Sequence, residues 1–162
     1  MYTLRCTQRL LRRLPQEVTP EPPAPTTRLG DWYANSLFIR HKQLVLCTSD
    51  RSLLSVIVPL KDPVRLPIRL RDAVLSLFQR LGYPARIGAA EAHEMAQVAI
   101  GRTANRSVLG SMNDIARHCR WYADDNATFD VGQLELQLAE MPMLTLECAF
   151  PREQAAALLG AV

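Results

Sequence analysis

Residues 32–60 decide the fold, and they read WYANSLFIRHKQLVLCTSDRSLLSVIVPL. The stretch contains three runs rich in β-branched and aliphatic residues, separated by the short polar segments His41–Gln43 and Ser49–Arg51. Such runs with short polar breaks are typical of strands joined by hairpins. The pattern therefore predicts an antiparallel β-meander with strands at 35–40, 44–48 and 53–59. The last strand is almost continuously apolar over 55–58, which predicts that it is covered on both faces.

The residues before this meander predict a further strand and a connector. Residues 2–6 alternate between apolar and polar side chains, which is the period of a half-buried strand. Thr7 is a candidate N-cap for a short helix over residues 8–14. Five prolines lie between residues 15 and 30. Because proline fixes φ and lacks an amide donor, we expect an extended connector there.

After Leu66 the apolar spacing changes to 3.6 residues, which predicts helices. The expected helices cover residues 67–81, 85–101, 107–123, 131–140 and 151–159. The sequence thus predicts a single α+β domain over residues 1–162. Its small antiparallel sheet, of about four strands from residues 2–60, would pack against a C-terminal helical layer.

The composition indicates a soluble, cytoplasmic protein. The chain has 162 residues, 48% of them apolar, and a net charge of +3, which together exclude a disordered chain. No stretch approaches the ~18 apolar residues of a membrane span, and arginines interrupt the N-terminal apolar residues, so we expect neither a membrane segment nor a secretory signal. The cysteines at positions 6, 47, 119 and 148 lack metal-binding spacing and predict four free thiols.

Charge is distributed unevenly along the chain. Residues 1–83 carry 13 basic and 6 acidic side chains (net +7), whereas residues 84–162 carry 6 and 10 (net −4). The asymmetry is compatible with an anion-binding face on the first half, or with attraction between the two halves of one domain. No run of five basic residues occurs, so we favour the second interpretation. A nucleic-acid partner is disfavoured without being excluded.

The familiar catalytic and cofactor motifs are missing from the sequence. His93-Glu94 resembles the start of the zinc-protease motif His-Glu-x-x-His, but Gln97 stands where the second histidine is required. No glycine-rich phosphate loop and no Gly-x-Ser-x-Gly nucleophile motif occurs. We therefore expect no metal and no cofactor.

The predicted helix 107–123 carries the strongest candidate for a site. Its polar stripe consists of Ser107, Ser111, Asp114 and His118, and its apolar stripe of Val108, Met112, Ile115, Cys119 and Tyr122. Asp114 and His118 lie one turn apart, so the carboxylate could orient the imidazole as a general base, with Arg106 and Asn113 binding an anionic or amide group. The alternative is a hydrated helix face that Ser107 caps.

Two further expectations concern the packing of this helix. A glycine inside a helix costs about 1 kcal/mol, so Gly110 predicts a close approach at that turn. We expect Gly110 to pack against the sheet, with Arg106 and Asn113 bonded to the backbone of residues 26–31 and Asp114 contributing to stability. Trp32 and Asn35, at the entrance of the meander, are further binding candidates. Trp32 would either stack on a ligand or belong to the core.

Three segments resemble a known family: MYTLRCTQRLL at residues 1–11, PTTRLGDWYAN at 25–35 and NRSVLGSMND at 105–114. The sequence resembles a family of small uncharacterised bacterial proteins that is known as a domain of unknown function. The resemblance spans residues 1–140 and implies no activity, cofactor or catalytic residue.

The absence of catalytic motifs leads to our functional expectation. We expect a non-enzymatic, cytoplasmic binding or regulatory module that works through contacts with a protein partner. The alternative is a hydrolase, acting in one version on nucleic acid, that uses Asp114 and His118 with Arg106 and Asn113. A concave pocket that unites these residues with Trp32 or Asn35 would favour the hydrolase.

Overall fold

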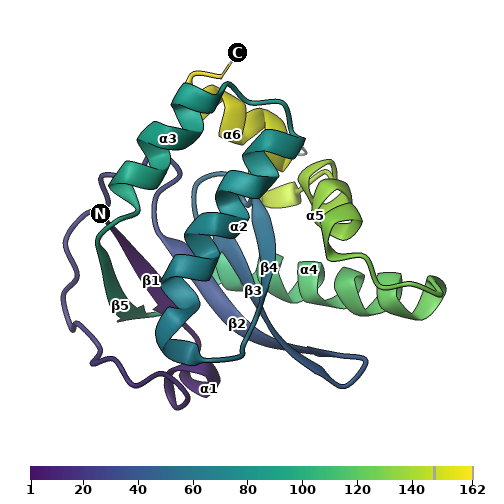
Figure 1. The fold of residues 1–162 in the computed structure, drawn as a ribbon, viewed down its shortest axis with the longest axis horizontal. Helices are drawn as coiled ribbons and strands as arrows, with labels where there is room; N and C mark the ends of the chain where they lie inside the picture. The colour runs from purple at the N-terminus through teal and green to yellow at the C-terminus, as the bar shows by residue number, and fades with distance from the viewer. Residues whose placement is uncertain (148, 162) are drawn as a thin grey trace.

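A five-stranded mixed sheet forms the centre of the protein, described here by a computed structural model of residues 1–147 and 149–161 (Figure 1). The strand order is β4-β3-β2-β1-β5. The strands are β1 (Tyr2–Cys6), β2 (Trp32–Ile39), β3 (Lys42–Ser49), β4 (Ser55–Pro59) and β5 (Val98–Arg102). The predicted α+β class is therefore confirmed.

The predicted meander is present, with longer strands than the sequence suggested. β2 pairs antiparallel with β3 from Trp32 opposite Ser49 to Ile39 opposite Lys42, and β3 pairs antiparallel with β4. The first hairpin therefore turns over two residues, Arg40 and His41, whose φ angles are +47° and +63°. Two consecutive positive φ values match a type I′ turn, whose twist suits paired strands. The predicted polar turn thus starts one residue earlier and lets Lys42 and Gln43 join β3.

The predictions of a purely antiparallel sheet and of a helix over 85–101 are wrong. β1 runs parallel to both of its neighbours, β2 and β5. Helix α3 (Ala85–Glu94) ends early, and residues 98–102 form β5. Pairing with β1, which is distant in sequence, overrides the helical spacing of Ile87, Met95 and Val98, since strand formation depends on such cross-strand neighbours.

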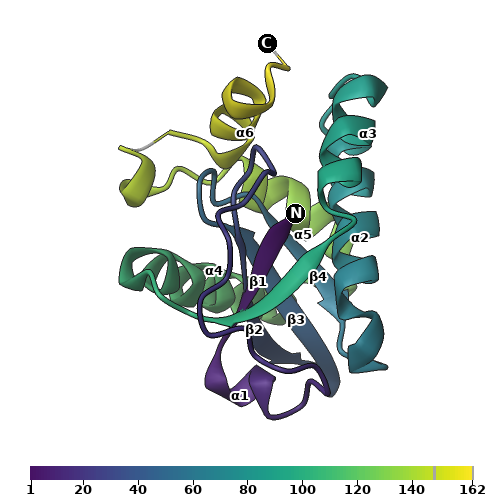
Figure 2. The same ribbon diagram turned by 90° about the vertical axis from the view of Figure 1, so that its left-hand side faces the viewer.

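Helices cover both faces of the sheet, whereas the sequence predicted a single layer. Figure 2 shows α2 (Leu66–Arg80) and α3 on one face and α4 (Arg106–Asp125) on the other. α5 (Val131–Ala139) lies beside β4, and α6 (Pro151–Leu159) lies near the C-terminus. The short α1 (Gln8–Leu11) follows β1 directly. In the described part of the chain, no helix combines the length and apolar character needed to cross a membrane.

Two apolar clusters fill the space between the sheet and its helices. The cluster on the α2 side contains Trp32, Cys6 and Cys47, and the cluster on the α4 side contains Cys119. These three cysteines are buried free thiols, as predicted, and burial raises the pKa of Cys6 and of Cys119 to about 12. The prediction for Cys148 falls outside the described residues.

The proline-rich connector ends in a loop, residues 26–31, that several side chains hold in place. The buried Glu91 carboxylate accepts the backbone N–H groups of Arg28 and Leu29, both at 3.0 Å. Asp31 accepts the N–H of Thr3 at 2.9 Å and pairs with the Arg5 guanidinium at 2.7 Å. The loop therefore joins α3 to the sheet.

Both outer edges of the sheet are covered. Along β5, the Thr19 N–H from the connector donates to the Ile100 carbonyl at 2.7 Å. Along β4, the Ile57 N–H donates to Glu135 Oε1 at 2.8 Å, and Pro59 has no N–H to offer. Arg80 pairs with this carboxylate, although burial still raises the pKa of Glu135. Such covering prevents strand addition at the edges.

Candidate functional site

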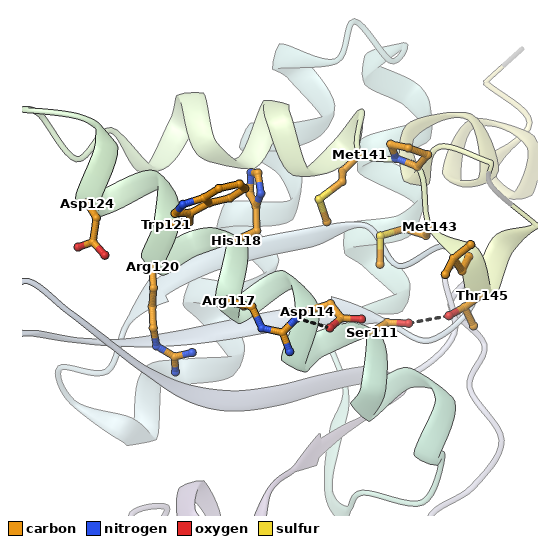
Figure 3. A pocket seen from close by; sticks show the side chains of 12 residues that line it. Ser111, Asp114, Arg117, His118, Arg120, Trp121, Asp124, Met141, Met143 and Thr145 are labelled. Atoms are coloured by element: carbon orange, nitrogen blue, oxygen red, sulfur yellow. Dashed lines mark hydrogen bonds and ion pairs between the residues drawn. The ribbon is translucent and has the colours of Figure 1, made fainter.

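A groove with a volume of about 630 Å³ lies between α4 and the segment 141–145 (Figure 3). Residues from the polar stripe of α4 form one side, and the chain between α5 and α6 forms the other. The residues that line the groove are Ser111, Asp114, Arg117, His118, Arg120, Trp121, Asp124, Met141, Pro142, Met143, Leu144 and Thr145.

The sequence of α4 explains why this stripe faces the groove. The Asn105 side chain caps the helix by accepting the N–H groups of Ser107 and Val108 at 2.9 and 3.3 Å. The cap is therefore Asn105, and the prediction that Ser107 caps the helix is wrong. The predicted apolar stripe is buried from Val108 to Cys119 against β2 and β3. Its burial turns Ser111, Asp114 and His118 toward the groove.

The groove is largely apolar and carries two exposed hydrophobic side chains. Trp121, on α4, is 66% exposed, and Leu144, on the opposite segment, is 88% exposed. Met143 lies buried between them and belongs to the core on the α4 side. The Met143 N–H donates to the Ala149 carbonyl at 3.2 Å within the chain between α5 and α6, and the buried Met143 side chain packs this segment against α4.

Two pairs of polar groups in the groove bond to each other, and neither pair is part of a catalytic triad. The Ser111 hydroxyl bonds to the Thr145 hydroxyl at 2.7 Å, and the Asp114 carboxylate pairs with Arg117 at 3.3 Å. In Figure 3 the His118 ring lies beside the Trp121 indole, and the Asp114 carboxylate points toward Arg117. Within the described residues, the His118 side chain has no hydrogen bond or ion pair to Asp114 or to Ser111.

Arg106 and Asn113 do not take part in this groove. Both side chains are exposed on α4, and neither bonds to residues 26–31 in the described structure. Gly110 is also exposed, with no heavy atom within 4 Å of a Cβ placed on it. The expectation that these residues tie α4 to the loop is therefore wrong, because the apolar stripe alone faces the sheet.

Trp32 and Asn35 lie elsewhere in the fold. Trp32 is fully buried in the cluster on the α2 side, which matches the core alternative for this residue. The Asn35 side chain accepts the Thr7 hydroxyl proton at 2.9 Å. The structure thus brings Asp114 and His118 together in one groove and separates them from the other four candidates.

Two parts of the groove were missed by the sequence analysis. Trp121 extends the polar stripe by one turn beyond His118, so continuing the stripe would have found it. The segment 141–145 gave no signal, because its position beside α4 depends on tertiary packing. Among residues 1–147 and 149–161, no group of three or more histidine, cysteine, aspartate or glutamate side chains is placed to hold a metal ion.

Comparison with models of known protein families identifies the family of this chain. The model of the family "Domain of unknown function (DUF6933)" matches residues 3–154, nearly the whole chain, and the protein belongs to this family. No curated protein matches the sequence, and no solved structure matches either.

Proposed function

We propose that this member of the DUF6933 family is a non-enzymatic binding module that docks an apolar segment of a partner protein in the groove beside α4. The observation that carries the proposal is the pair of exposed apolar side chains, Trp121 and Leu144, on the two sides of that groove. Exposed apolar side chains that gather around one groove, unlike single scattered ones, mark sites of protein interaction. The three buried free thiols support a reducing, cytoplasmic setting for the module.

The charges around the groove favour an uncharged partner segment. Asp114 is neutralised by Arg117, and Asp124 and Arg120 carry opposite charges. No net charge therefore remains to select a strongly acidic or basic ligand. Tryptophan and methionine are enriched in protein interfaces, and methionine adapts its shape to different apolar neighbours.

The exposure of the groove favours a protein segment over a small molecule. Small-molecule sites bury most of the surface of their ligand inside a cavity. Here the two apolar side chains at the edges remain mostly exposed, so a small ligand between them would stay in contact with water. A protein segment covers these edges itself, and burial of an aromatic anchor at the centre of an interface supplies much of the binding energy.

The hydrogen bonds in the groove support binding over hydrolysis. A general base needs an orienting carboxylate and a nucleophile within hydrogen-bond distance of the imidazole. Asp114 pairs with Arg117, and the Ser111 hydroxyl bonds to Thr145. His118 accordingly contributes to the surface of the groove in this proposal, and no proton transfer is assigned to it.

Selection of displayed random peptides against the full chain tests the proposal. We expect the selected peptides to be rich in leucine, phenylalanine and methionine. Trp121→Ala and Leu144→Ser should each weaken their binding about tenfold or more, as for a central interface residue. Binding should also protect Trp121 from quenching by acrylamide, while Trp32 is already protected by burial.

Phe38→Ala is the matched control, since this aromatic side chain is 55% exposed but lies outside the groove. The control variant should bind the peptides as the unmodified protein does. Selected peptides that bind Trp121→Ala and the unmodified protein equally, or a selection that enriches no peptide, would contradict the proposal.

A further inference from the structure

The second half of β2 lacks a strand neighbour on the side of β1. β3 pairs with β2 over its full length, but β1 pairs only with Trp32–Ala34. The last backbone bond on this side runs from the Thr7 N–H to the Ala34 carbonyl at 3.0 Å. The chain then turns into α1, so the alternation of the ladder directs the backbone of Ser36 and Phe38 toward α1 instead of toward a strand.

A small pocket of about 120 Å³ lies at this open part of β2. Three arginines line it: Arg9 from α1, Arg13 from the turn that follows, and Arg120 from α4. None of the three forms an ion pair within the described part of the chain. Among the described residues, none that lines the pocket is acidic.

A buried hydroxyl group also faces this region without a partner. The Ser36 Oγ atom, on the β2 side of the pocket, is buried and has no hydrogen-bond partner among residues 1–147 and 149–161. A buried polar atom without a partner costs free energy, and structures seldom keep one without a reason. Arginine side chains around one pocket, together with a free hydroxyl donor, supply the kinds of group that bind an oxyanion.

We propose that this pocket binds a phosphate monoester group. Its volume of about 120 Å³ suits a group of the size of one tetrahedral anion. A phosphate monoester carries close to two negative charges at neutral pH and offers three strong acceptor oxygens, so it can accept from several arginines at once. The excess of basic residues in positions 1–83 adds a long-range attraction for such an anion.

Calorimetric titration of the full chain at constant ionic strength tests this site, with inorganic phosphate, glycerol phosphate and a short phosphoserine peptide as probes. Arg9→Gln and Arg13→Gln should each weaken binding about tenfold, as expected for loss of a charge-assisted hydrogen bond. Ser36→Ala should weaken it without changing the charge. Arg12→Gln is the matched control, because Arg12 carries the same charge between the two arginines but does not line the pocket.

The outcomes separate a built site from general attraction. Equal weakening by Arg12→Gln and Arg9→Gln, or no binding of any probe, would overturn the proposal. Tighter binding of glycerol phosphate than of the phosphopeptide assigns the group to a free metabolite, and the reverse assigns it to a phosphorylated protein. Arg120 lines both the pocket and the groove, so no variant of Arg120 is used. Trp121→Ala should bind phosphate as tightly as the unmodified protein does. This result separates a failure of the phosphate site from a failure of the groove.

Discussion

The loop 26–31 and the segment 105–114 contain similar residues and use them in opposite ways. Each has an arginine, a glycine, an aspartate and hydroxyl side chains. In the loop, Arg28 donates to the Leu159 carbonyl at 2.9 Å, Asp31 accepts from Thr3, and Gly30 has a φ of +79°. In the segment, Arg106 and Gly110 are exposed, and Asp114 forms only an exposed ion pair.

The difference follows from how each stretch satisfies its backbone. A loop makes few backbone hydrogen bonds of its own, so side chains must supply the partners of its buried N–H and C=O groups. A helix satisfies its backbone internally beyond the first turn, so polar side chains in its interior remain free. The segment 105–114 needs only the Asn105 cap, and its residues Arg106, Ser107 and Asn113 remain exposed.

Removing the side chain that holds the loop should have the largest effect. Glu91→Ala leaves one buried and one part-buried backbone donor without an acceptor, and we expect it to lower the free energy of unfolding by about 3 kcal/mol. Asp114→Ala, in the segment, should change it by less than about 0.5 kcal/mol, because exposed ion pairs contribute little. Urea denaturation of both variants measures the difference, and equal losses would refute the distinction between the two regions.

Two glycines sharpen the comparison. A Cβ at Gly101, in β5 beside the connector, would lie 2.6 Å from Thr3 Cγ2, so Gly101→Ala should destabilise the protein by about 2 kcal/mol. Gly110→Ala meets nothing and adds helix propensity, so it should stabilise by about 0.5–1 kcal/mol. Thermal denaturation reports both signs. A lower melting temperature for Gly110→Ala would show that this position does require glycine.

The loop also contains a pH-dependent weakness at its contact with Asp50. Burial, and then the negative charge of Asp31, raise the pKa of Asp50 from 3.8 to about 6. A pKa that is higher in the folded state disfavours ionisation there, so Asp50 lowers stability as pH rises from about 4 to about 6. Because this side chain is partly exposed, we expect a loss of about 1 kcal/mol.

Asp50→Asn removes this titration. As pH rises from about 4 to about 6, the free energy of unfolding of this variant should therefore increase relative to that of the unmodified protein. The unfolding free energies of the two proteins, measured at several pH values, give the difference directly. If the free energies of unfolding of the two proteins change with pH in parallel, the pKa of Asp50 is not raised in the folded protein, and the prediction is wrong.

The smallest expected effect belongs to the groove. Trp121→Ala should change the free energy of unfolding by less than about 0.5 kcal/mol, since an exposed side chain loses few contacts. Its fluorescence should nevertheless shift to shorter wavelength, because the remaining Trp32 is fully buried. A clear loss of stability would show that Trp121 serves the fold and would weaken its assignment to a partner.

Much of the fold could be predicted from local patterns. The meander, α2 and the apolar stripe of α4 follow from the spacing of apolar residues over short distances. β5 could not be predicted, since its five residues continue the helical spacing of α3 and become a strand only by pairing with β1. The parallel direction of β1 is likewise set by the path of the connector, which proline content does not specify.

The candidate site was predictable to the same extent. One helix face placed Ser111, Asp114 and His118 together, and that part of the prediction rested on local periodicity. The groove itself required the segment 141–145, and the arginine pocket required α1, β2 and α4 to meet. The spacing of residues within one helix or strand does not predict these contacts, because they join residues that are far apart in the sequence.

The position of β1 has a consequence for the order in which the protein folds. β2, β3 and β4 follow one another along the chain and can pair as soon as they are synthesised. β1 lies between β2 and β5, and Tyr2 pairs with Val98. Contacts between such distant residues form slowly because a long loop must close first. The edge of the sheet beyond β1 is therefore completed only after residues 98–102 have been synthesised, whereas the pairing of β1 with β2 needs no residue beyond Ala34.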